Sequence, residues 1–208
     1  MALRLNGSSS GYVELDVPAA AGSHTLTLPD GGGSSGQYLQ TNGSGALSWQ
    51  TVSGTQWTDG SQQTLSGTSL TFSSIPSNVV YIQITILDMS LNGTSDLRVR
   101  LGDSGGEEST GYVGRAYATN SVTAMATNAF GFEFINAAAY QYSGQVQFWK
   151  HSGNTWLSEG RVAQQTVADQ MAYSGMKGLS DTLTQIRLFG SSGHSFDNGS
   201  VTLHYLTS

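Results

Sequence analysis

Residues 79–87 are VVYIQITIL, and this stretch decides the fold class of the 208-residue chain. Isoleucine occupies every second position from Ile82 to Ile86, with Gln83 and Thr85 between. Successive side chains of a strand point to opposite faces, so this alternation predicts a β-strand with one apolar face. The run is also far too short to span a bilayer as a helix.

The same period of two recurs further along the chain. It is found at residues 97–101, 130–134, 146–148, 186–188 and 201–205. Turn sequences such as LNGTSD, GDSGG, HSGNT, GSSG and DNG separate these segments, and no stretch has a helical period over three turns. The sequence therefore predicts an all-β chain. Residues 63–208 are expected to form an antiparallel β-sandwich of the jelly-roll type, with a C-terminal strand inside a sheet.

The first 53 residues differ from the rest of the chain. Short apolar groups at 3–5, 12–17, 26–28, 38–39 and 47–49 alternate with Gly/Ser clusters, as in a series of short strands and turns. So few large apolar residues cannot close a core, so we expect residues 1–53 to be buried against the rest of the chain or against other copies of it. A flexible tail is the alternative, but the alternation at 12–17 favours a strand. Residues 54–62 have no periodicity and are predicted to be a linker.

Composition excludes several classes of partner. Charged residues make up 11% of the chain, the net charge is −6, and Lys and Arg together number 8. These charges cannot form the cationic stripe that nucleic acid requires, and anionic membranes are disfavoured for the same reason. There is no cysteine, which excludes disulfides and thiolate ligands. The N-terminal sequence MALRLNGSSSG has no apolar segment of signal-peptide length, so we expect no export signal.

The most suggestive catalytic motif is GDSGG at 102–106, which matches the nucleophile segment of chymotrypsin-like proteases. The only histidine before it is His24, and the motif directly follows a predicted strand, so we interpret it as a hairpin turn. Glu107 and Glu108 are adjacent and point to opposite faces of a strand, so they cannot act as an acid–base pair. A cation bound by Asp103 and these glutamates is the alternative to a solvated loop.

No other motif indicates chemistry. The histidines stand singly, at His24, His151, His194 and His204. GGGSSG at 31–36 lacks the Lys of a phosphate-binding loop. The sequence thus predicts no catalytic, cofactor-binding or metal-binding residue, and a protein that is not an enzyme.

Aromatic residues are the remaining candidates for a binding site. They are Trp49, Trp57, Trp149, Trp156, Tyr140, Tyr142 and Tyr173. Because Trp149 alternates with Phe148, one of the two is expected at the surface or at an interface. These side chains are suited either to stacking on sugars or to burial between subunits, and we favour burial between subunits.

Three segments resemble tailed-phage virion surface proteins. Residues 2–50 contain LTLP (26–29), GQYL (36–39) and TNGSG (41–45) followed by LSW (47–49); residues 97–117 and 184–206 are similar to strand–loop–strand units of phage-fibre jelly rolls. Together they cover about half of the chain. The pattern contains no catalytic residue or cofactor site. The short N-terminal module departs from the long shaft of many tail fibres.

The resemblance implies a homotrimeric, non-enzymatic component of the virion surface, assembled in the host cytoplasm. It would be a capsid decoration, a head fibre or a short tail fibre, attached to capsid or tail proteins through residues 1–53. The main alternative is an adhesin module that recognises a host-surface carbohydrate. A depolymerase or protease is a third hypothesis, for which neither clustered acids nor a triad is visible.

Overall fold

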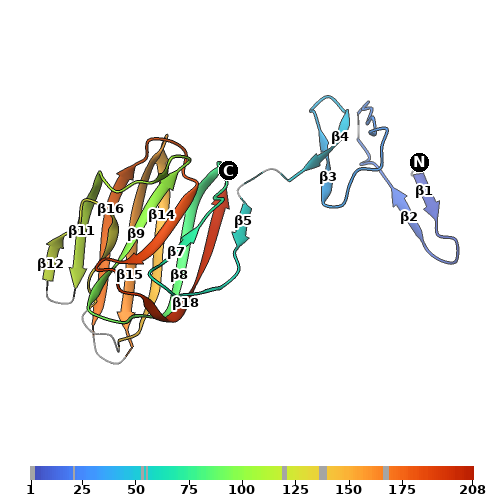
Figure 1. The fold of residues 1–208 in the computed structure, drawn as a ribbon. Helices are drawn as coiled ribbons and strands as arrows, with labels where there is room; N and C mark the ends of the chain where they lie inside the picture. The colour runs from blue at the N-terminus through green and yellow to red at the C-terminus, as the bar shows by residue number, and fades with distance from the viewer. Residues whose placement is uncertain are drawn as a thin grey trace. The chain divides into compact units, whose positions relative to one another are not determined.

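The computed structural model describes residues 3–20, 22–52, 54, 56–118, 121–135, 140–165 and 169–208. The chain divides into two compact units, Met1–Ser53 and Gly54–Ser208. All regular elements within the described residues are strands, and the pairs of named strands are antiparallel (Figure 1). The all-β prediction is therefore confirmed. The described part of the chain has no helix that could cross a membrane.

The described residues of the unit Met1–Ser53, which we call the N-terminal unit, form two hairpins. One joins β1 (Leu3–Asn6) to β2 (Tyr12–Leu15), and the other joins β3 (Gln37–Thr41) to β4 (Leu47–Thr51). The chain between the hairpins returns to the second one, where Thr27 forms a parallel bridge with Ala46. The short strands expected in this region are therefore present.

The TNGSG motif forms the turn between β3 and β4, and its Asn and Gly residues each have a structural role there. The Asn42 side chain accepts hydrogen bonds from the backbone N–H groups of Ser44 (2.8 Å) and Ala46 (3.2 Å). Gly45 has φ +92°, and a Cβ there would collide with the Thr25 carbonyl oxygen. The motif thus lets the chain around Thr25 approach the turn closely enough to bridge it.

Trp49 holds the glycine-rich segment at residues 31–36 in place. Its indole N–H donates to the Gly31 carbonyl oxygen at 2.6 Å. A Cβ on Gly33 would lie 2.6 Å from the Trp49 ring, so only glycine fits there. The glycine-rich segment and the LSW segment are therefore parts of one local structure.

The unit Gly54–Ser208 is a two-layer β-sandwich. Among the described residues, the larger sheet has nine strands: β5 (Gln56–Asp59), β6 (Gln63–Thr64), β8 (Val79–Leu91), β11 (Tyr112–Ala118), β12 (Ser121–Ala124), β14 (Tyr142–Ser152), β15 (Thr155–Gln164), β16 (Gln170–Gly178) and β18 (Phe196–Thr207). The smaller sheet has five: β7 (Ser69–Phe72), β9 (Ser95–Asp103), β10 (Gly106–Glu107), β13 (Phe130–Ile135) and β17 (Gln185–Gly190). β18 lies between β8 and β5, so the predicted C-terminal strand is inside the sheet.

Strand pairing in the sandwich is nested. β8 pairs with β18, β9 with β17 and β11 with β16, so early and late strands alternate between the two sheets. The order in the larger sheet is β12-β11-β16-β15-β14-β8-β18-β5, with β6 beside β18. The hairpin β14–β15 lies between β8 and β16 in the larger sheet. The sandwich is confirmed, whereas the jelly-roll topology remains a prediction.

Aromatic rings join the two sheets in the core. Phe130 of the smaller sheet lies 4.9 Å from the Tyr112 ring and 5.9 Å from the Tyr173 ring of the larger sheet, measured between ring centroids. Phe130 and the alternating isoleucines of β8 have almost no exposed surface. Phe148 is buried in this core and Trp149 is half-buried on the other face, as their alternation predicts.

The expected linker at 54–62 requires a correction. Residues 56–59 form β5, which pairs with β18 from Thr207 to His204. Among the described residues, β18 is the one strand that pairs with this edge strand, so its sequence need not show the alternation of a buried strand. The segment is therefore part of the sandwich rather than a free connection.

Candidate binding surface

The outer face of the larger sheet has an apolar row that crosses seven strands. Each member is the direct cross-strand partner of the next, in the order Val113 (β11), Met176 (β16), Leu157 (β15), Trp149 (β14), Tyr81 (β8), Leu206 (β18) and Trp57 (β5). Val113 is 63% exposed and Met176 is 45% exposed. We call this set the apolar row. A continuous apolar strip on a solvent-facing sheet indicates a surface that contacts a partner or ligand.

Mostly polar residues occupy the next two rows of the same face. Two positions along each strand lie Arg115, Ser174, Glu159, Gln147, Gln83, His204 and Asp59, again as direct partners. Beyond them lie Tyr117, Ala172, Arg161, Gln145, Thr85 and Thr202. The face therefore changes from apolar to hydrogen-bonding over the length of two residues.

Aromatic rings are in contact at the β5 end of the apolar row. The Tyr81 ring lies 5.6 Å from Trp149 and 6.0 Å from Trp57, and the His204 ring stacks on Trp57 at 5.8 Å. Asp59 accepts hydrogen bonds from His204 Nδ1 (2.8 Å) and the Trp57 indole N–H (2.7 Å). These two bonds lower the pKa of Asp59 and hold the Trp57 ring in place.

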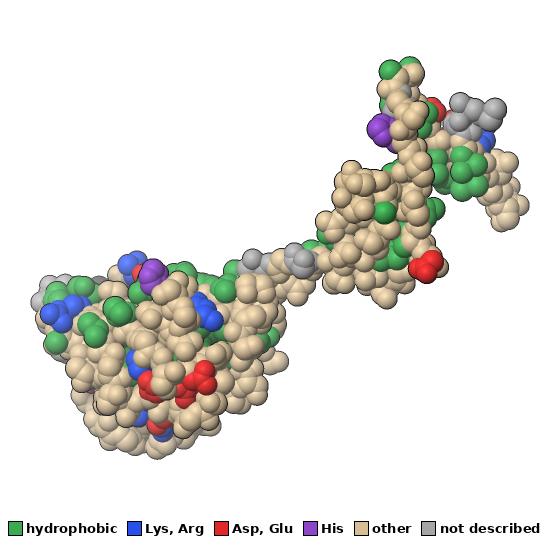
Figure 2. All heavy atoms as spheres, turned by 90° about the horizontal axis from the view of Figure 1, so that it is seen from above, with side chains coloured by type: hydrophobic (Ala, Val, Ile, Leu, Met, Phe, Trp, Pro, Cys, Tyr) green, Lys and Arg blue, Asp and Glu red, His purple; other side chains and the backbone are tan. Residues whose placement is uncertain are grey.

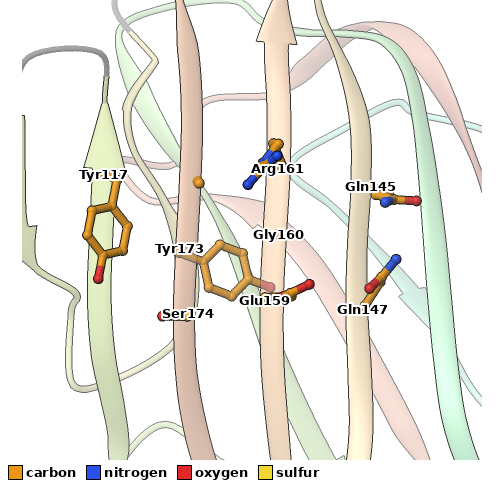
Figure 3. A pocket seen from close by; sticks show the side chains of 9 residues that line it. Tyr117, Gln145, Gln147, Glu159, Gly160, Arg161, Tyr173 and Ser174 are labelled. Atoms are coloured by element: carbon orange, nitrogen blue, oxygen red, sulfur yellow. The ribbon is translucent and has the colours of Figure 1, made fainter.

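A hollow of about 530 Å³ lies over β16 at the other end of the polar rows (Figure 3). β16 supplies two small side chains, Ala172 and Ser174, between Tyr117 of β11 and the pair Glu159 and Arg161 of β15. Because the middle strand has small residues, the larger neighbours become walls. The far side is lined by the two glutamines of β14, Gln145 and Gln147.

The polar walls of this hollow have no protein partners within the described residues. They are Tyr117, Gln145, Gln147, Glu159, Arg161 and Ser174, and no side-chain hydrogen bond or ion pair joins any of them to another described residue. Tyr173 also borders the hollow, but its hydroxyl pairs with Ser158 at 2.9 Å inside the core. The hollow thus presents a set of free donors and acceptors to a ligand.

Residues 103–108, called the acidic loop, are different because Asp103, Glu107 and Glu108 already have partners within the protein. Glu108 forms an ion pair with Lys177, which is buried, and the Ser180 hydroxyl lies 2.6 Å from Asp103 Oδ2 and 2.8 Å from Glu108 Oε1. Bonds from Ser180 and the Gly105 N–H lower the pKa of Asp103. Burial alone would raise the pKa of Glu108, but bonds from Lys177 and Ser180 outweigh burial and lower it.

The GDSGG motif forms the predicted hairpin, since Asp103 of β9 pairs with Gly106 of β10. The Ser104 hydroxyl lies 3.5 Å from Asp181 Oδ2. Glu107 pairs with Arg100 (3.3 Å) and Arg187 (2.7 Å). Among the described residues, no three His, Asp or Glu side chains are arranged to hold a metal ion.

The structure separates the aromatic residues that the sequence grouped together. Trp156, only 1% exposed, is on the inner face of the sheet, and Tyr142 and Tyr173 are buried there too. The hypothesis that Trp156 belongs to a surface set is therefore wrong. Trp149 and Trp57 are on the outer face, and Trp49 belongs to the N-terminal unit.

Sequence reasoning missed most of this surface. Leu157 and Met176 occupy the outward positions of β15 and β16, and a single strand pattern cannot show that they lie side by side. The sequence does show that every second residue of β15, namely Leu157, Glu159 and Arg161, lies on one face of the strand. This pattern becomes informative only when the strand register is known.

The N-terminal unit has a second exposed apolar surface (Figure 2). Its exposed large apolar side chains are Leu3, Leu5, Tyr12, Val13, Leu15, Val17, Leu26, Leu28, Tyr38, Leu39 and Val52. Leu26 and Leu28, which flank the bridging Thr27, are 68% and 69% exposed. Within the described residues of the N-terminal unit, nothing buries them.

No protein-family model, curated protein or solved structure matches this chain.

Proposed function

We propose that this chain is a non-enzymatic structural protein of a tailed-phage virion, a homotrimeric surface component attached through its N-terminal unit. The observation that supports assembly most directly is the exposure of the apolar side chains in that unit. The resemblance of residues 2–50, 97–117 and 184–206 to virion surface proteins supports the placement on a virion and the number of subunits.

The physical argument rests on the size of the N-terminal unit. An isolated two-stranded hairpin such as β1–β2 is at best marginally stable in water. Leu3, Leu5 and Leu15 of this hairpin are all more than half exposed, although burying one such side chain is worth about 1.5–3 kcal/mol. Contact with further copies or with a virion protein would recover that free energy and order the unit at the same time.

Sedimentation velocity of the full chain tests the assembly. We expect a trimer at micromolar concentration, and a monomer for a chain truncated to residues 54–208, whose core lies within that unit. Leu26→Ser together with Leu28→Ser should weaken the trimer. The matched control is Leu87→Ser, which removes a 49% exposed leucine from the sandwich. A monomeric full chain with an ordered N-terminal unit would contradict the proposal.

The virion placement needs a separate measurement. Immunogold electron microscopy, with antibodies against the sandwich, should label the surface of particles of the phage that encodes this chain. Absence of the protein from purified particles would rule out a virion role, whatever its oligomeric state.

A further inference from the structure

We propose that the hollow over β16, with the adjoining part of the apolar row, is a saccharide-binding site. This inference concerns the sandwich and does not depend on the function proposed for the N-terminal unit. The site consists of Tyr117, Gln145, Gln147, Glu159, Arg161 and Ser174 (Figure 3). Leu157 and Met176 line the adjoining depression along one side.

The mixture of hydrogen-bonding groups defines the ligand. Gln145 and Gln147 each provide donors and an acceptor, Glu159 only accepts, and Arg161 only donates. A sugar hydroxyl both donates and accepts, so neighbouring hydroxyls can pair with all of these groups. Since the side chains have no partners among the described residues, a ligand would replace water without breaking bonds within the protein.

The apolar row supplies the second requirement. A shallower depression of about 370 Å³ adjoins the hollow, shares Glu159 and Ser174 with it, and is lined by Trp149, Leu157 and Met176. A pyranose ring has an apolar C–H face and a rim of hydroxyls. On this surface, the C–H face can cover Leu157 and Met176 while the hydroxyls reach Glu159 and Ser174.

Ligands of other classes fit the same groups less well. Glu159 repels a phosphate, and Arg161, two residues along the same strand, repels a metal cation. A peptide could not extend the sheet, because β11, β16, β15 and β14 already pair with neighbours along the hollow. Its own backbone groups would then lie unpaired over the apolar row, at a cost that a saccharide avoids.

The arrangement favours binding over cleavage. Most glycoside hydrolases use two carboxylates about 5–10 Å apart across the bond that breaks. Glu159 is the one carboxylate that lines the hollow among the described residues. We therefore expect a saccharide to be held intact.

A glycan array tests the proposal with the full chain. The probes are neutral hexose and N-acetylhexosamine oligosaccharides, and hits are measured again by isothermal titration calorimetry. Gln147→Ala and Glu159→Gln should each weaken binding about tenfold, the loss of about one or two hydrogen bonds. Ala172→Gln fills the floor of the hollow and should abolish binding. Thr85→Ala, on the same face but outside the hollow, should leave binding unchanged.

If the array gives no binding at millimolar saccharide, or if Ala172→Gln binds as well as the parent chain, the proposal is wrong. If Ala172→Gln changes the sedimentation coefficient and saccharides do not bind, the face is a contact between copies instead. Should Ala172→Gln fail to fold by thermal unfolding, Gln147→Ala against Thr85→Ala decides the question. The trimer test is independent, because it concerns the other unit.

Discussion

The N-terminal unit and the sandwich have similar alternating apolar patterns, but the apolar side chains are exposed in the first and buried in the second. In β8 of the sandwich, Ile82, Ile84 and Ile86 are buried against the second sheet. In β1 of the N-terminal unit, Leu3 and Leu5 alternate in the same way, yet both are more than half exposed. Alternation therefore specifies a strand with one apolar face, while burial of that face requires a second layer. Within the described residues of the N-terminal unit, no second layer covers that face.

The largest expected difference between the two units is in their response to truncated side chains. Phe130→Ala should destabilise the sandwich by about 3–5 kcal/mol, because it leaves a cavity among Tyr112, Phe148 and Tyr173. Leu28→Ala in the N-terminal unit should change the same unfolding transition by less than about 0.5 kcal/mol, since its side chain is exposed. Urea denaturation followed by tryptophan fluorescence measures both.

The same two variants also test whether the N-terminal unit has a core of its own. If Leu28→Ala destabilised the dilute, dissociated chain as strongly as Phe130→Ala, the N-terminal unit would have a core of its own. The contrast between the two units would then be lost.

Ion pairs provide a smaller contrast. The Lys177 side chain is 4% exposed where it meets Glu108, whereas the Arg4–Glu14 pair of the β1–β2 hairpin is 54% and 30% exposed. Lys177→Met removes the cation and leaves Glu108 partly buried, so we expect a loss of about 1–3 kcal/mol. Arg4→Met should cost about 0–1 kcal/mol. If Lys177→Met and Arg4→Met lowered the thermal stability equally, burial would not be what makes the Lys177–Glu108 pair more stabilising.

The acidic loop should make the sandwich sensitive to low pH. The pKa values of Asp103 and Glu108 lie below their ordinary values of 3.8 and 4.5 in the folded state. Their contribution to stability is therefore complete above about pH 4.5 to 5 and is lost as the pH falls through the lowered values. Unfolding free energies between pH 6 and pH 3 should decline, and Glu108→Gln should flatten the decline. If the unfolding free energy of Glu108→Gln fell with pH as steeply as that of the parent chain, other groups would be responsible for the acid sensitivity.

The strands and the two units were predictable from the sequence because both depend on local patterns. The alternation in β8, the turn at GDSGG and the short strands before Ser53 are all visible in stretches of fewer than ten residues. The role of residues 56–59 was not predictable in this way. An edge strand is held by backbone bonds to β18, and polar residues there satisfy the ladder as well as apolar ones.

The candidate site was almost invisible before the strand register was known. The hollow depends on small residues of β16 lying between larger ones of β11 and β15, and β11 is far from the consecutive strands β15 and β16 in the chain. Trp156 shows the converse error. Aromatic content suggested a surface role, but its place in β15 points it into the core.

A local effect in one turn tests whether the N-terminal unit has a specific structure at all. Gly43 and Gly45 both have positive φ, +85° and +92°, in the β3–β4 turn. A Cβ on Gly43 has open space, whereas a Cβ on Gly45 would run into the Thr25 carbonyl oxygen. Gly43→Ala should therefore cost only the backbone strain of about 1 kcal/mol. Gly45→Ala should also break the bridge in which the Leu47 N–H donates to Thr27 (2.8 Å).

Hydrogen exchange distinguishes these two substitutions. The amides of Leu47 and Thr27, which form the bridge, should exchange faster in Gly45→Ala than in Gly43→Ala. Amides of β8 in the sandwich should be unaffected in both variants. If the two variants gave the same exchange rates at Leu47, the bridge would contribute nothing. The N-terminal unit would then behave as a flexible tail until a partner orders it.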